Sequence, residues 1–184
     1  MGKQIGKFKY SKGYLVGMCY LMLLMATFCS MMICYAFKFL LGDTNFSFLL
    51  MGIANLLING SMLYNFLWNQ GDKEANYIQF GHMEKEDYKG FKVGAFVMIF
   101  YVVLDIVLAL SVFGVFDFEF LRAFRIINAP LYGFMKLVNA GLEISVFEYI
   151  ITALMPFVYL LFCGFGYELG IRHISIKERM VYKQ

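Results

Sequence analysis

Four long apolar runs restrict this chain to a membrane-embedded fold. They cover about residues 14–41, 46–68, 93–116 and 149–171, and each holds at least 23 residues with at most one charged residue. Because about 20 apolar residues cross the hydrocarbon core of a bilayer, all four runs qualify as spans. Hydrophobic residues make up 61% of the chain, more than a soluble domain carries. We therefore predict an all-α integral membrane protein surrounded by lipid bilayer, with residues 1–184 forming a single membrane domain built on a bundle of four transmembrane helices.

The basic residues predict how this bundle is oriented. Arg122, Arg125 and Lys136 lie on one side of the predicted spans, with Lys38 near that boundary. Because cytoplasmic segments of membrane proteins are enriched in Lys and Arg, we expect the other, more basic side and both termini to be cytoplasmic, in the plasma membrane. The first run is longer than the hydrophobic stretch of a signal peptide, about 7 to 15 residues, and is expected to remain as a span. The more basic side holds Lys3, Lys7, Lys9, Lys12, Lys73, Lys85, Lys89, Lys92, Arg172, Lys177, Arg179 and Lys183.

The segment 121–142 is apolar, but it carries charges that a fifth span would have to bury. Its apolar residues fall on one helical face and its polar residues on another, which predicts a helix lying in the membrane interface, bent near Pro130. A re-entrant hairpin, buried among the other helices, is the alternative. The apolar face comprises Leu121, Phe124, Leu131, Met135, Val138 and Leu142, and the polar face comprises Arg122, Arg125, Tyr132, Lys136, Asn139 and Glu143.

One acid, Asp105, lies near the middle of the third predicted span, where a charge is costly. At about 1.5 Å per residue, Thr27, Asn55 and Tyr159 fall at a similar depth in the other spans, and Asn59 shares a helical face with Asn55. We predict that these five residues form a mid-membrane polar layer, in which an uncharged Asp105 bonds to Asn55 or Asn59 and holds helices together. The alternatives are transport of a proton or cation through the layer and an ion pair with another subunit.

Two pairs of glycines have the G-x-x-x-G spacing that permits close packing of membrane helices. Gly13 and Gly17 form one pair at the start of the first span, and Gly166 and Gly170 form the other at the end of the fourth. We expect both pairs to mediate helix packing, within the monomer or with a partner.

Motifs of enzymes and cofactor sites are missing from the sequence. It contains no G-x-S-x-G, H-E-x-x-H, P-loop or G-x-G-x-x-G pattern. His82, Glu84, Glu86 and Asp87 lie among lysines at a spacing that matches no standard metal site, which favours a solvated loop. We therefore expect no cofactor, no metal and no nucleic-acid partner, and an enzyme is the least favoured function.

Two functions from different classes remain. In the first, the chain is a non-catalytic subunit or accessory factor of a membrane complex, bound to other membrane subunits or to itself. In the second, it is a small transporter or channel that uses the polar layer around Asp105. Four spans are few for a monomeric transporter, so the first function is preferred.

Overall fold

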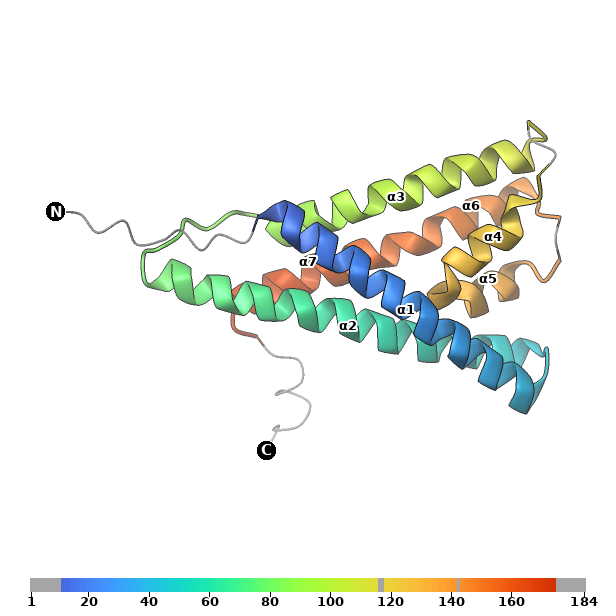
Figure 1. The fold of residues 1–184 in the computed structure, drawn as a ribbon, viewed down its shortest axis with the longest axis horizontal. Coiled ribbons are helices and arrows are strands. Elements are labelled where there is room, and N and C mark those ends of the chain that lie inside the picture. Colours follow the sequence, from blue (N-terminus) through green and yellow to red (C-terminus); the bar gives the residue numbers. More distant parts are fainter. Residues whose placement is uncertain (1–10, 116–117, 142, 175–184) are drawn as a thin grey trace.

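A computed structural model describes residues 11–115, 118–141 and 143–174, and all regular structure within these ranges is helical (Figure 1). Four helical segments are long and apolar enough to cross a membrane: α1, α2, α3 and the continuous stretch Val146–Ile171. The structure thus confirms the predicted all-α bundle with four membrane-spanning helices. The elements are α1 (Lys12–Leu41), α2 (Asn45–Gln79), α3 (Lys89–Val112), α4 (Phe120–Ile127), η1 (Ala129–Leu131), α5 (Tyr132–Val138), α6 (Val146–Leu154), η2 (Met155–Phe157) and α7 (Val158–Ile171).

Some sequence predictions fall on residues outside the described ranges. The expected ends of the third run at 116 and of the amphipathic segment at 142 are among them. So are six of the twelve basic residues that orient the bundle: Lys3, Lys7, Lys9, Lys177, Arg179 and Lys183.

The long helices share two ends, which we name for reference. At the tail end, on the left of Figure 1, α1 and α3 begin and α2 and α7 end. At the hairpin end, the turn between α1 and α2 lies near the short helices α4 and α5. The 35 residues of α2 extend for about 52 Å, well beyond the about 30 Å of a hydrocarbon core. The part of α2 after Trp68, which we expected in a solvated loop, is therefore helical and projects past the apolar run.

Local sequence signals explain where the helices start, stop and bend. Gly42 ends α1 with a positive φ of 69°, and the Thr44 side chain accepts a hydrogen bond from the Ser47 backbone at the start of α2. Pro130 and Pro156 each lie in a short 3₁₀ turn, because proline lacks the backbone N–H that an α-helix needs. The fourth span is accordingly divided into α6, η2 and α7.

α7 packs between α2 and α3. The backbones of α2 and α7 meet so closely that a Cβ atom on Gly71 or Gly170 would overlap the backbone of the facing helix. A Cβ on Gly166 would lie 2.9 Å from the Tyr64 carbonyl oxygen. Gly13 and Gly17 differ: a Cβ on Gly17 would meet nothing within 4 Å, and one on Gly13 only the Ser11 hydroxyl, at 3.7 Å. Gly166 and Gly170 thus lie at a close contact between helices, whereas Gly13 and Gly17 have open space beside them.

The amphipathic segment folds back on itself as a hairpin of α4, η1 and α5, which packs against α1, α2 and α3. Most of its apolar face is buried, and Gly133 lies directly against the α2 backbone at Phe48 and Gly52. The Thr27 hydroxyl donates a hydrogen bond to the Ile127 carbonyl oxygen at 3.4 Å. Thr27 precedes the end of α1 by 14 residues, or about 21 Å. The hairpin therefore lies along the sides of the long helices, as in the re-entrant alternative, and not flat across the end of the bundle as expected for an interfacial helix.

This hairpin predicts a depth profile that a flat interfacial helix would not give. Single spin labels at Arg122, Ile126 and Leu137 all replace side chains on the surface of the bundle. Because α4 runs inward and α5 returns, we expect the label at Ile126 to be the deepest, as measured by its accessibility to oxygen relative to a polar nickel reagent. Equal shallow depths at all three positions would contradict the hairpin.

Candidate functional site

Among the described residues, three polar clusters join different parts of the bundle. The tail-end cluster consists of Glu74, Lys89 and Tyr167. The α1–α2 seam consists of Ser30, Cys34, Asn55 and Asn59. The loop cluster consists of Arg125, Asn139 and Glu148.

The tail-end cluster is a buried ion pair with an added hydroxyl. Lys89 Nζ lies 2.5 Å from Glu74 Oε1, and the Tyr167 hydroxyl donates to Glu74 Oε2. Each of the three residues is only 1% exposed. A Cβ on Gly90 would lie 2.5 Å from Tyr167 Cβ, so α3 meets α7 closely at this level. One carboxylate thus links α2, α3 and α7.

Sequence reasoning missed this cluster, because Glu74 and Lys89 fall in a segment rich in charges that was assigned to a solvated loop. A signal was nevertheless present. Leu67, Gly71, Glu74 and Ala75 follow one another at helical spacing and are all buried, so the interior face of α2 continues past the apolar run. Extending that face by two turns places Glu74 inside the bundle.

The α1–α2 seam contains two residues of the predicted polar layer. Asn59 Nδ2 donates to Ser30 Oγ and to the Asn55 carbonyl oxygen, both at 2.8 Å. Asn55 Nδ2 donates to Cys34 Sγ at 3.3 Å. These asparagines therefore face α1, and their side chains join α2 to its sequence neighbour.

The remaining residues of the predicted layer do not join the asparagines. Asp105 is 8% exposed, and its Oδ1 has no hydrogen-bond partner among the described residues; its backbone carbonyl accepts from the Tyr149 hydroxyl at 3.3 Å. Tyr159 is buried against the Tyr101 ring, and Thr27 bonds to the hairpin. The expected bond from Asp105 to Asn55 or Asn59 is not formed, because α7 lies between α2 and α3.

The loop cluster holds the connection between the hairpin and α6. Arg125 is buried; its Nη1 donates to the Gly141 carbonyl oxygen and its Nη2 to the Asn139 carbonyl oxygen, both at 2.7 Å. Asn139 Nδ2 donates to Glu148 Oε2 at 2.9 Å, and Glu148 forms a capping box with Ser145 at the start of α6. Arg125, expected on a polar surface, is therefore an interior residue whose charge is satisfied mainly by backbone carbonyls.

Outside the spans, the loop between α2 and α3 carries a second group of charges. Glu86 lies 2.5 Å from Lys12 Nζ and 3.1 Å from Lys92 Nζ. The hydrogen bond from Lys12, aided by Lys92, lowers the pKa of Glu86 to about 2. Across the described ranges, no group of three or more His, Cys, Asp or Glu side chains is arranged to hold a metal ion.

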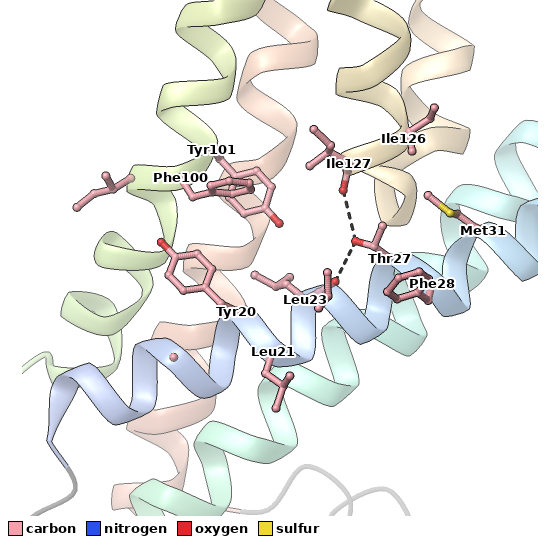
Figure 2. A pocket seen from close by; sticks show the side chains of 13 residues that line it. Tyr20, Leu21, Leu23, Thr27, Phe28, Met31, Phe100, Tyr101, Ile126 and Ile127 are labelled. Atoms are coloured by element: carbon pink, nitrogen blue, oxygen red, sulfur yellow. Dashed lines mark hydrogen bonds between the residues drawn. The ribbon is translucent and has the colours of Figure 1, made fainter.

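An apolar groove of about 1020 Å³ runs between α1, α3 and α4, and we call it the α1–α3 groove (Figure 2). Two of its polar side chains, Tyr20 and Thr27, are bonded within the chain. The Tyr20 hydroxyl donates to the Phe96 carbonyl oxygen at 3.0 Å, and the Thr27 hydroxyl donates to Leu23 and Ile127. The groove is lined by Gly17, Tyr20, Leu21, Leu23, Leu24, Thr27, Phe28, Met31, Ile99, Phe100, Tyr101, Ile126 and Ile127.

No family model, curated protein or solved structure matches this chain. The function is therefore argued from its own residues.

The tail-end cluster makes a sharp prediction about stability. Replacing Lys89 by Met leaves the Glu74 carboxylate buried without its cation, which should lower the free energy of unfolding by about 3–5 kcal/mol. The double variant Glu74→Leu/Lys89→Met removes both charges and should recover most of that loss. The free energies of unfolding of the single and the double variant can be measured in mixed micelles with an increasing fraction of denaturing detergent.

Lys85 provides the matched control for that measurement. It pairs at 3.6 Å with Asp87 on the protein surface, and such a pair contributes about 0–1 kcal/mol. A Lys89→Met variant that is no less stable than Lys85→Met would show that the buried pair does not hold the helices together.

Proposed function

We propose that this chain is a non-catalytic subunit or accessory factor of a membrane complex, with both termini in the cytoplasm. The buried polar groups support this proposal, because several of them join helices to one another or hold a loop. Asn59 bonds α2 to α1, Glu74 joins three helices, and Arg125 secures a loop. Such contacts suit a fixed scaffold better than a moving transport pathway.

The observation that carries the proposal is the helical extension of α2 past its apolar run. Its last turns are held by the tail-end cluster to α3 and α7. The same extension displays aromatic side chains on its surface: Tyr77 is exposed, and Phe80, directly after α2, is 70% exposed. Aromatic residues are enriched in the cores of protein interfaces, and ordering them in advance lowers the entropy that binding costs. The cytoplasmic end of α2 is thus a platform for a protein partner.

Purification in a mild detergent, followed by mass spectrometry of co-purifying proteins, tests this proposal. We expect a reproducible partner that is retained by the wild type and lost from the variant Tyr77→Ser/Phe80→Ser. The control Gln79→Ser/His82→Ser alters neighbouring surface residues and should keep the partner. A homogeneous oligomer of this chain alone, or a partner equally bound by both variants, would contradict the platform.

One observation favours a second function, a small transporter or channel. Asp105 Oδ1 is buried in the membrane-spanning part of α3 without a hydrogen-bond partner among the described residues, and intramembrane acids often mark ion paths. The two functions differ in what Asp105→Asn does, because Asn preserves size and hydrogen bonding but cannot titrate. The subunit proposal expects this variant to fold and to retain its partner. Proton or cation flux in proteoliposomes that Asp105→Asn abolishes would favour transport.

A further inference from the structure

The two walls of the α1–α3 groove each lead to a lysine at the tail end. On α1, Lys12 precedes Tyr20, Leu23 and Thr27 by 8, 11 and 15 residues, which places all four on one helical stripe. On α3, Lys92 precedes Ile99 and Phe100 by 7 and 8 residues and shares their stripe. The apolar groove and the two lysines therefore form one continuous surface.

The group formed by Lys12, Lys92 and Glu86 carries a surplus of one positive charge. Lys12 and Lys92 share a single carboxylate, that of Glu86, so two positive charges face one negative charge. The side chains of Lys12 and Lys92 are 40% and 48% exposed, and both retain surface for a further anion. Lysines at the end of a span reach the headgroup region by snorkelling.

The groove has the dimensions of a hydrocarbon chain. From Gly17 to Met31 it follows α1 for about 21 Å, more than the about 15 Å that one leaflet contributes to the hydrocarbon core. The Tyr20 and Thr27 hydroxyl groups are already bonded within the chain, so an apolar occupant leaves both of them satisfied. The bond from Tyr20 to Phe96 ties α1 to α3 across the groove, which leaves no room for a further helix about 10 Å wide between them.

Gly17 leaves the outer side of the groove open beside the hydrogen bond from Tyr20 to Phe96. A Cβ at Gly17 would meet nothing within 4 Å, so a flexible chain can pass Tyr20 on that side. We infer that the α1–α3 groove binds one acyl chain of an anionic phospholipid, whose phosphate contacts the exposed sides of Lys12 and Lys92, away from Glu86. This inference does not depend on the proposed subunit function.

Native mass spectrometry of the delipidated protein tests the site with two probes that carry the same acyl chains, dioleoyl phosphatidylglycerol and dioleoyl phosphatidylcholine. We expect phosphatidylglycerol to bind more tightly to the wild type. Each of Lys12→Gln and Lys92→Gln should weaken phosphatidylglycerol binding about fivefold and leave phosphatidylcholine binding unchanged. Equal affinity of the wild type for the two lipids would overturn the inference.

Two variants separate attraction of the phosphate from a merely structural role of the lysines. Glu86→Gln also breaks the ion pairs but leaves both lysines charged, so it should retain or strengthen phosphatidylglycerol binding. Lys85→Gln removes a nearby surface lysine that pairs with Asp87 and should change nothing. Weaker binding by Glu86→Gln, equal to that of the lysine variants, would refute the charge argument.

A second set of variants tests the groove. Gly17→Leu and Leu24→Trp fill it at two levels and should weaken binding of both lipids, whereas Leu57→Trp, on an exposed face of α2 outside the groove, should not. A Leu24→Trp variant that binds lipid like Leu57→Trp would overturn the assignment.

Wild-type protein incubated with phosphatidylglycerol bearing a photoreactive acyl chain should be labelled on residues 17–31 or 99–101. Labelling confined to other helices, or cross-linking of the groove to a protein, would also overturn it.

Discussion

The close approach of α2 and α7 is the contact on which the rest of the bundle depends. Lipid tails are as apolar as the side chains that face them, so membrane helices associate through packing and hydrogen bonds more than through the hydrophobic effect. Gly71, Gly166 and Gly170 let the two backbones meet, and Gly94 and Gly164 bring α3 against the other side of α7. α7 consequently lies between α2 and α3.

This order of helices decides which polar groups meet. Because α7 separates α2 from α3, Asp105 and Asn55 remain apart although they lie at similar depth, and the asparagines bond to α1. At the tail end the same separation is bridged by Glu74, whose carboxylate contacts a lysine of α3 and a tyrosine of α7. The α1–α3 groove follows from the same arrangement, since α1 crosses α3 at Tyr20 without filling the space along it. The tail-end cluster, the α1–α2 seam and the groove thus all reflect which helices are neighbours.

The four spans could be predicted from the sequence because a run of about 20 apolar residues is a sufficient signal by itself. The buried face of the hairpin could also be predicted from periodicity, but its position in the bundle could not. The close contact of Gly133 with the α2 backbone at Phe48 depends on the tertiary structure and leaves no signal in the sequence around Gly133. The depth of a residue along a span does not determine which helices are neighbours. For this reason the contact predicted between Asp105 and Asn55 is absent from the structure. The burial of Glu74 could not be predicted for a related reason. Its charge is compensated by Lys89, which follows 15 residues later and belongs to another helix, α3.

The close packing of α7 against α2 is tested most directly by one pair of glycine substitutions compared in the same detergent. In Gly170→Ala the new methyl group overlaps the backbone of α2 at Trp68, and we predict that the free energy of unfolding falls by about 1–3 kcal/mol. In Gly13→Ala the new methyl group meets only the Ser11 hydroxyl at 3.7 Å, and we predict unchanged or slightly higher stability because alanine favours the helix. Equal stability of the two variants would contradict an α7 packed backbone to backbone against α2.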